Sequence, residues 1–204
     1  LATPYKRNGE IDVVSLAKLV KRQVDGKVDG VLACGTTGEE PFLTFAEKQT
    51  VVSVCKIVAG ELPVWMGIGG STTAEAVKKA KLAKQLGADE LLLAPPPFSK
   101  CTETGYAKHV TAVCHAFGGK VWLYDCPSRS GYGLPKNAIK SAIDCVAGIK
   151  TAASDDDLDN FCKTQGIETL RGCDEKAVTE NVGGVISVTS NVAPVLTRKV
   201  GEKR

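Results

Sequence analysis

The sequence lacks the features that mark several classes of protein. Its eight cysteines lie at least eleven positions apart, whereas zinc and iron–sulfur sites generally need two cysteines within about five positions of each other. No apolar run approaches the roughly 20 residues that cross a bilayer. The net charge of +3, from 26 basic and 23 acidic side chains, is too small and too scattered to suggest a nucleic-acid partner. We therefore expect no metal, no nucleic acid and no membrane.

The residues given also lack a signal peptide and the short, loop-rich character of a disulfide scaffold. Cys34, in VLACG, and Cys145, in IDCVAG, instead lie within apolar runs, as small buried side chains do. This pattern favours free thiols in a reducing, cytoplasmic compartment. What the sequence does have is 43% apolar residues over 204 positions, which excludes disorder and is sufficient for one domain with a sizeable core.

Short runs rich in apolar and β-branched residues alternate along the chain with stretches of helical periodicity. The expected strands are Val28–Cys34, Leu62–Ile68, Glu90–Ala94, Lys120–Tyr124, Val146–Lys150, Glu168–Arg171 and Val185–Thr189, preceded by a stub at Leu1–Pro4. The expected helices include Val14–Val24, Phe45–Val58, Thr73–Leu86 and Thr104–Ala116. The strands are continuously apolar rather than alternating, which indicates a parallel sheet with both faces covered.

Eight strands alternating with helices predict an α/β fold, a single (β/α)8 TIM barrel over residues 1–204. Such barrels usually need about 250 residues. This chain opens within a strand, stops within what should be the eighth helix, and has only Glu175–Val182 for the seventh. We therefore expect a barrel that is truncated at both ends and possibly has internal residues omitted.

Catalytic groups of such barrels gather at the carboxyl ends of the strands. The first polar segment there is GTTGE, residues 35–39. Two hydroxyl residues between glycines let backbone N–H groups and hydroxyls converge on an anion the size of a carboxylate or phosphate. The same segment could equally form an ordinary turn into a helix.

Two further strand ends carry polar side chains. Tyr124 and Arg129, in YDCPSRSG, could relay a proton and bind a carboxylate, although a packed rim tyrosine and a surface ion pair are common alternatives. Lys150 ends an apolar strand, where partial desolvation would favour the neutral amine that a Schiff-base nucleophile needs. Its alternative role is an ion pair with Asp174 or Glu39.

These motifs occur together and in order. GTTGE, YDCPSRSG, GIK and GGVISVTSN resemble the family of dihydrodipicolinate synthase and N-acetylneuraminate lyase, which are class I, pyruvate-dependent aldolases built on (β/α)8 barrels. The resemblance covers nearly the whole chain, from LATP to SNVAP. The family normally carries a further C-terminal helical region, which is missing from these residues.

The resemblance implies a role for each matching residue. Lys150 would form an imine with pyruvate, and no other cofactor or metal would be needed. Thr36 and Thr37 match the residues that bind the pyruvate carboxylate, with Thr37 also passing on protons. Tyr124 matches the tyrosine that shuttles protons during imine formation, and Arg129 matches the arginine that holds the carboxylate of the incoming aldehyde.

Two more positions complete the implied site. Gly172, in RGCD, matches a glycine that lines the pyruvate pocket, and Ile186 matches a residue whose backbone carbonyl faces the bound pyruvate. The implied partners are pyruvate, a small aldehyde and further copies of the chain, because family members are commonly homodimers or homotetramers.

The implied reaction is a lyase-type condensation of pyruvate with L-aspartate 4-semialdehyde to 4-hydroxy-tetrahydrodipicolinate, in lysine and diaminopimelate biosynthesis. The PSR loop and GVISVTSN favour this subgroup. An aldolase for a 2-keto-3-deoxy sugar acid, or an N-acetylneuraminate lyase, is the alternative within the family. A further alternative is a non-catalytic barrel that binds pyruvate-like acids.

Three positions depart from the family pattern. Phe98, in PPPFSK, stands where the synthases usually have a tyrosine that crosses the dimer interface and completes the neighbour's proton relay. Phe98 has no hydroxyl, so water or another group would have to replace it. Asp125 replaces the usual asparagine, and Thr151 replaces the usual glutamate after the lysine.

Overall fold

The computed structural model describes residues 1–153, 155–175 and 183–202. Six strands alternate with helices, as the sequence predicts. The strands are β1 (Val31–Ala33), β2 (Val64–Ile68), β3 (Glu90–Leu93), β4 (Val121–Asp125), β5 (Val146–Thr151) and β6 (Glu168–Arg171). The helices are α1 (Val13–Asp25), η1 (Glu40–Phe42), α2 (Phe45–Ala59), α3 (Thr73–Gln85), α4 (Glu103–Phe117), α5 (Pro127–Ser130), α6 (Lys136–Ser141), η2 (Ile143–Cys145), α7 (Asp156–Gln165), η3 (Thr189–Asn191) and α9 (Pro194–Glu202).

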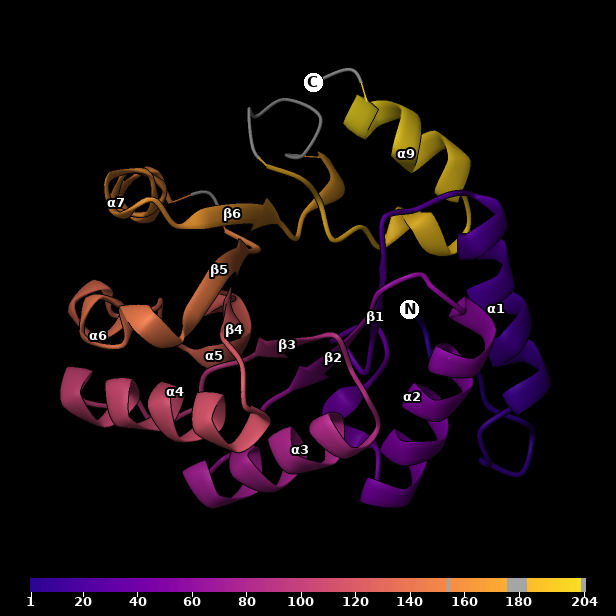
Figure 1. The fold of residues 1–204 in the computed structure, drawn as a ribbon, viewed down its shortest axis with the longest axis horizontal. Coiled ribbons are helices and arrows are strands. Elements are labelled where there is room, and N and C mark those ends of the chain that lie inside the picture. The colour runs from indigo at the N-terminus through magenta and orange to yellow at the C-terminus, as the bar shows by residue number, and fades with distance from the viewer. Residues whose placement is uncertain (154, 176–182, 203–204) are drawn as a thin grey trace.

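The strands form one parallel sheet in the order β1-β2-β3-β4-β5-β6. Figure 1 shows the strands in an arc with α2, α3, α4, α6 and α7 along its outer side, and with α9 beside α1. Because every strand runs the same way, the carboxyl ends of all six lie along the same edge of the sheet. Residues that follow different strands are therefore brought together there.

The prediction of eight strands is wrong for the first and the last. Leu1–Pro4 forms no strand; the amino group of Leu1 donates to Leu32 O at 2.7 Å. Val185 makes one isolated parallel bridge to Arg171, and the adjacent residues do not continue it. Without consecutive pairs at either edge, the described residues form a six-stranded partial barrel. The helix expected at Glu175–Val182 falls on residues 176–182, which lie outside the described part.

Local sequence signals place the helices as expected. The predicted ends of α1, α2, α3 and α4 agree with the structure within one residue. Asp12, Thr44 and Thr72 each accept a hydrogen bond from a backbone N–H of the first turn, which is the usual role of a helix N-cap. Gly87 follows α3 with φ +70°, a left-handed conformation that glycine adopts without strain.

Strand β1 is shorter than the predicted Val28–Cys34 because the backbone turns at both ends. Lys27 and Cys34 have φ values of +54° and +51°, which are incompatible with an extended strand. The turn at Cys34 brings its carbonyl so close to β2 that a Cβ on Gly67 would lie 2.3 Å from Cys34 O. Glycine at position 67 therefore permits the turn that leads into GTTGE.

The core has an outer and an inner part. The outer part packs the helices against the sheet and includes fully buried side chains such as Leu16 and Val110. The inner part lines the concave side, where the ring centroids of Trp65 and Trp122 are 5.0 Å apart. A Cβ on Gly148 would lie 2.3 Å from Trp122 Cζ3, so only glycine admits the indole. The inner part extends to Tyr124.

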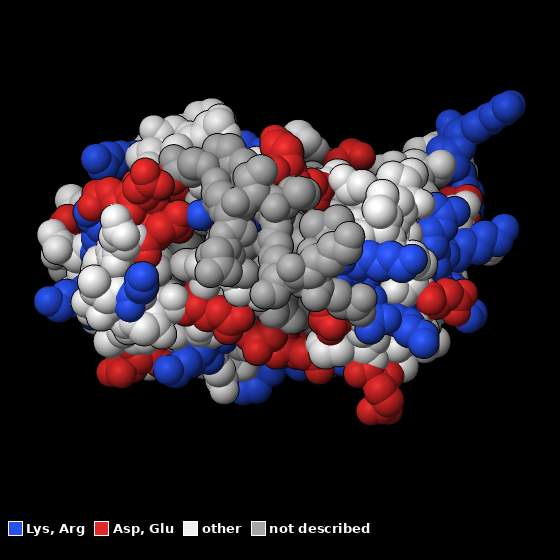
Figure 2. Space-filling model, turned by 90° about the horizontal axis from the view of Figure 1, so that it is seen from above, with Lys and Arg blue, Asp and Glu red and all other residues white. Residues whose placement is uncertain are grey.

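The surface charges are unevenly distributed. Figure 2 shows basic side chains gathered at the end of the molecule where α1 and α9 lie, and both helices carry lysine and arginine. The small net charge of +3 therefore includes a locally basic end. In the described part of the chain, no helix has the length and apolar character needed to cross a membrane.

Candidate active site

Lys150 and Tyr124 lie side by side at the carboxyl ends of β5 and β4. The two residues are partners in the parallel ladder, so their side chains leave the same face of the sheet. Lys150 Nζ lies 4.4 Å from the centroid of the Tyr124 ring. This face is the concave one, because Tyr124 belongs to the inner part of the core.

The surroundings of Lys150 favour the neutral amine. Its side chain is buried, and this desolvation lowers the pKa of Lys150 from 10.5 to about 8, with a smaller contribution from the nearby positive charge of Arg129. The carboxylate of Asp174, one of the partners considered for Lys150, accepts hydrogen bonds from the backbone N–H groups of Val188 and Thr189. With this pKa, about a tenth of Lys150 is unprotonated at pH 7, far more than for an ordinary lysine.

Gly172 provides space next to Lys150. A Cβ at this position would lie 2.6 Å from Lys150 Cε, closer than any side chain could come. Gly172 N donates to Thr151 O at 2.7 Å, which fixes the backbone after β6 against the end of β5. The glycine thus allows the lysine side chain to extend along the cavity wall.

Arg129 is placed by the short helix α5, which begins directly after β4. Its Nη1 donates to Tyr124 Oη at 3.4 Å. The hydroxyl of Ser130 donates to Cys126 O and Tyr132 O, and Leu134 N donates to Asp125 Oδ1 at 2.9 Å. These buried contacts fix the segment, while the guanidinium of Arg129 remains exposed and available to a carboxylate.

The tyrosine hydroxyl connects Arg129 to the GTTGE segment. Burial raises the pKa of Tyr124, while a hydrogen bond with Thr36 and the charge of Arg129 act in the opposite direction. Tyr124 therefore stays protonated at neutral pH and can donate a proton. Thr36 and Thr37 are exposed in this turn. The turn is closed by two backbone hydrogen bonds, from Gly38 N to Gly35 O and from Glu39 N to Thr36 O.

The structure brings all the residues predicted from the sequence to one cavity of about 580 Å³. They come from five separate segments of the chain. The residues are Thr36, Thr37, Tyr124, Arg129, Lys150, Gly172 and Ile186. Ile186 reaches the cavity because its N–H donates to Arg171 O at 2.8 Å, which holds the segment beside β6.

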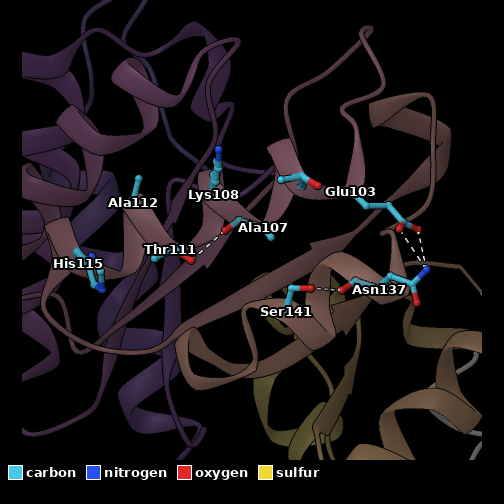
Figure 3. Close-up of a pocket in the computed structure, with 9 residues that line it drawn as sticks. Glu103, Ala107, Lys108, Thr111, Ala112, His115, Asn137 and Ser141 are labelled. Atoms are coloured by element: carbon cyan, nitrogen blue, oxygen red, sulfur yellow. Dashed lines mark hydrogen bonds between the residues drawn. The ribbon is translucent and has the colours of Figure 1, made fainter.

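A second hollow of about 510 Å³ lies between α4 and α6. In Figure 3, Glu103 of α4 faces Asn137 of α6, whose amide nitrogen lies 3.0 and 3.1 Å from the two carboxylate oxygens. The hydroxyls of Thr111 and Ser141 donate to backbone carbonyls of their own helices. Four of its polar side chains thus bond to neighbours within α4 and α6, and none of the predicted site residues lines it.

Sequence reasoning missed two kinds of residue around the larger cavity. Trp65 and Trp122 form part of its wall, and both look like ordinary apolar strand residues in the sequence. Cys126 and Cys173 lie close enough to Lys150 to influence its pKa. Cys126 directly follows YD and Cys173 directly follows RG, and these positions beside the candidate site residues were the available signal. All eight cysteines are free, six of them buried.

Comparison with known proteins identifies the family of this chain. The profile of the Dihydrodipicolinate synthetase family matches residues 1–203. A 4-hydroxy-tetrahydrodipicolinate synthase of Kosmotoga olearia is 35% identical over 207 residues, which cover 96% of this chain and 70% of that protein.

Solved structures of the family share the fold. The dihydrodipicolinate synthase of Acinetobacter baumannii, solved in complex with pyruvate, has a TM-score of 0.92 and 31% identity over 98% of this chain and 72% of its own. CdNal of Clostridium difficile, solved with mannosamine, has a TM-score of 0.91 and 25% identity, covering 99% of this chain and 73% of its own. The chain belongs to the Dihydrodipicolinate synthetase family, whose members are aldolase-type lyases.

Proposed function

We propose that this chain is a class I aldolase in which Lys150 forms a covalent imine with pyruvate. The observation that carries the proposal is the buried Lys150, with its pKa near 8, next to the Tyr124 ring in a cavity that also holds Arg129. A buried, partly neutral amine is the form of lysine that attacks a ketone carbon. The reaction needs no cofactor beyond this imine.

The first step joins Lys150 Nζ to the keto carbon of pyruvate. A proton moves from nitrogen to oxygen in the first adduct, which gives the carbinolamine. The carbinolamine hydroxyl then gains a second proton and leaves as water, while the nitrogen keeps its remaining proton in the iminium. Tyr124 is placed to move these protons, since its hydroxyl contacts Thr36 and Arg129 at the cavity wall. The hydroxyls of Thr36 and Thr37 would bind the pyruvate carboxylate, and Thr37 would pass protons on.

The iminium then accepts the electrons of a methyl C–H bond when that proton leaves, which gives an enamine. The enamine carbon attacks the aldehyde, so a C–C bond forms and the aldehyde oxygen takes up a proton. Hydrolysis of the imine, or attack by an amine of the product, releases Lys150. Gly172 leaves room beside the lysine for this exchange.

We propose L-aspartate 4-semialdehyde as the aldehyde and 4-hydroxy-tetrahydrodipicolinate as the product. Arg129 supports this choice, because its exposed guanidinium suits a short aldehyde with a carboxylate. The 35% identity to a 4-hydroxy-tetrahydrodipicolinate synthase also supports it. Cleavage of a sialic or sugar acid is the second candidate, because CdNal with mannosamine has nearly the same fold.

The assembly we propose is a homodimer or homotetramer. Phe98 is 94% exposed and adopts a left-handed φ of +68°, while its N–H donates to Ser130 O in the segment that carries Arg129. An aromatic ring that is held out in this way is suited to contact a second copy. Light scattering of wild type and Phe98→Ser tests this: the wild type should be oligomeric and the variant should dissociate more readily.

The decisive experiment is borohydride trapping with pyruvate, followed by peptide mass mapping. The reduced adduct should appear on the peptide that contains Lys150 and should be absent from Lys150→Ala. A folded wild type that gives no adduct would refute the imine mechanism and leave a barrel that only binds pyruvate-like acids. Steady-state kinetics with aspartate semialdehyde and with N-acetylmannosamine then decides between the two aldehyde classes.

A further inference from the structure

The GTTGE turn borders two cavities. Gly35 and Thr36 line the 580 Å³ cavity of the candidate site and also an adjoining cavity of about 270 Å³. In most of a protein interior, close packing fixes the position of a turn. Here Gly35 and Thr36 face open space in both cavities. The position of Thr36 therefore depends on directional polar contacts.

Those contacts come through η1, which follows the turn directly. Glu40 N donates to Gly35 O at 3.3 Å, which ties the start of η1 to the start of the turn. Lys48, from α2, extends its ammonium to the same short helix and donates to Glu40 O at 2.8 Å and to Leu43 O. The Lys48 side chain is only 2% exposed, so these bonds form away from competing water.

The carboxylate of Glu40 lies between two buried ammonium groups. Its Oε1 is 2.8 Å from Lys79 Nζ, on α3, and 3.4 Å from Lys48 Nζ. Lys79 also contacts Glu75 at 2.9 Å. The side chains of Lys79 and Glu40 are 6% and 10% exposed. Buried charges are tolerated when paired, and removal of one partner leaves the other uncompensated.

We propose that Glu40, Lys48 and Lys79 act as a clamp that holds Thr36 and Thr37 in the geometry needed to bind the carboxylate of pyruvate. The clamp rests on the proposed function, because it takes these threonines as the carboxylate-binding residues. All three are positioning residues that act through η1 and the turn. None lines the 580 Å³ cavity, and Glu40 and Lys79 line the adjoining 270 Å³ cavity.

The clamp predicts a specific kinetic signature. It acts on the carboxylate-binding turn, whereas Lys150 and Tyr124 are held by the β4–β5 ladder. A loosened clamp should therefore weaken pyruvate binding and leave the chemistry at saturating pyruvate nearly unchanged. A purely structural role would instead lower the fraction of active protein and leave the half-saturating concentration as it is.

The test compares the half-saturating pyruvate concentration for borohydride trapping, and the trapping rate at saturation, in folded variants. Lys79→Met should raise the half-saturating concentration about tenfold and change the saturated rate less than twofold. The double variant Glu40→Gln/Lys79→Met also removes the ion-pair partner of the buried Lys48, so it should raise the half-saturating concentration at least as much as Lys79→Met alone. Lys56→Met is the matched control. Lys56 lies on α2, and its substitution removes an ion pair with Asp89, away from the turn.

The outcomes separate the clamp from the imine mechanism. A wild type that is not trapped refutes the proposed function, and the clamp with it. A trapped wild type with an unchanged half-saturating concentration in Lys79→Met, or with a loss confined to the saturated rate, refutes the clamp alone. If Lys79→Met does not fold, Glu75→Gln replaces it, because it removes the more exposed ion-pair partner of Lys79. It should raise the half-saturating pyruvate concentration about threefold. An unchanged concentration would again refute the clamp.

Discussion

Lys150 and Tyr124 are direct partners across β5 and β4, and the ammonium nitrogen of the first lies 4.4 Å from the ring centroid of the second. The ring and the hydroxyl of Tyr124 can therefore be separated experimentally. The ring covers Lys150, whereas the hydroxyl lies at the contact with Thr36 and Arg129.

Tyr124→Phe keeps the ring and removes the hydroxyl. We expect the rate of imine formation to fall by about 10²- to 10⁴-fold, which is the usual contribution of a positioned proton-transfer group. The measurement is the rate of borohydride-trapped adduct at saturating pyruvate. Because burial is the main cause of the lowered Lys150 pKa, the pH dependence should stay near that of wild type. An unchanged rate would show that water carries the protons.

The pH dependence of kcat/KM for pyruvate should report on Lys150. Protonated lysine cannot attack the keto carbon, so activity should rise with pH and level off above an apparent pKa of about 8, the value that burial gives to Lys150. A profile measured between pH 6 and 10 tests this expectation. Activity that still rises steeply at pH 10 would instead mean that the lysine keeps its ordinary pKa and is fully hydrated in solution.

Lys150→Met should stabilise the folded chain while abolishing the imine. A pKa lowered from 10.5 to about 8 corresponds to a cost of about 3 kcal/mol for the charged form in the folded state. That cost is fully present below pH 8 and disappears between pH 8 and 10.5, where the unfolded state binds more protons. Denaturant unfolding at pH 7 should show a gain of about 1–3 kcal/mol. Lys140→Met, at an exposed position, should change the free energy of unfolding little at pH 7.

Arg129→Met should separate the two substrates. The side chain contacts Tyr124 from α5 and would bind the carboxylate of the aldehyde, so KM for aspartate semialdehyde should rise about 10- to 100-fold. The half-saturating pyruvate concentration in trapping should change less than threefold. Equal losses for both substrates would place Arg129 in pyruvate binding instead.

Asp125→Asn should increase stability at neutral pH. Burial is the main cause that raises the pKa of Asp125, and Asp155 and Asp159 act in the same direction. The folded state therefore prefers the protonated carboxyl, and stability is lost as the pH rises from the unfolded value of about 4 through the raised pKa. An asparagine keeps the acceptor for Leu134 N and avoids this loss.

For Asp125→Asn we expect a higher free energy of unfolding at pH 7 than for wild type, and no gain at pH 3, where the wild-type carboxyl is protonated as well. Asp144→Asn, at an exposed position of η2, is the control. Equal stability of the two chains at pH 7 would contradict the expectation.

The helices and the site residues were predictable because their signals are local. The N-cap residues Asp12 and Thr44 sit next to the turns they close, and Tyr124 and Lys150 sit at the ends of apolar runs. Parallel strands bring such ends together whatever the exact register. For the same reason, the sequence predicted that Arg129 would reach the same cavity.

Other features depend on contacts between distant segments, which a single sequence does not reveal. Glu40 and Lys79 are 39 positions apart, and in the sequence each looks like an ordinary surface charge. The same holds for Gly148, whose missing Cβ makes room for Trp122. The prediction of the first and last strands was wrong for a related reason. Their apolar pattern is present, but the backbone makes only one bridge at Val185 and no ladder at Leu1.

The single bridge at Val185 gives the cavity walls of unequal stiffness. Lys150 and Tyr124 lie within continuous ladders, which open only with much of the sheet. Ile186 lies in a segment held at β6 by two backbone hydrogen bonds, one of them from its own N–H. The wall that carries the proposed nucleophile is thus held by more backbone hydrogen bonds than the wall that carries Ile186.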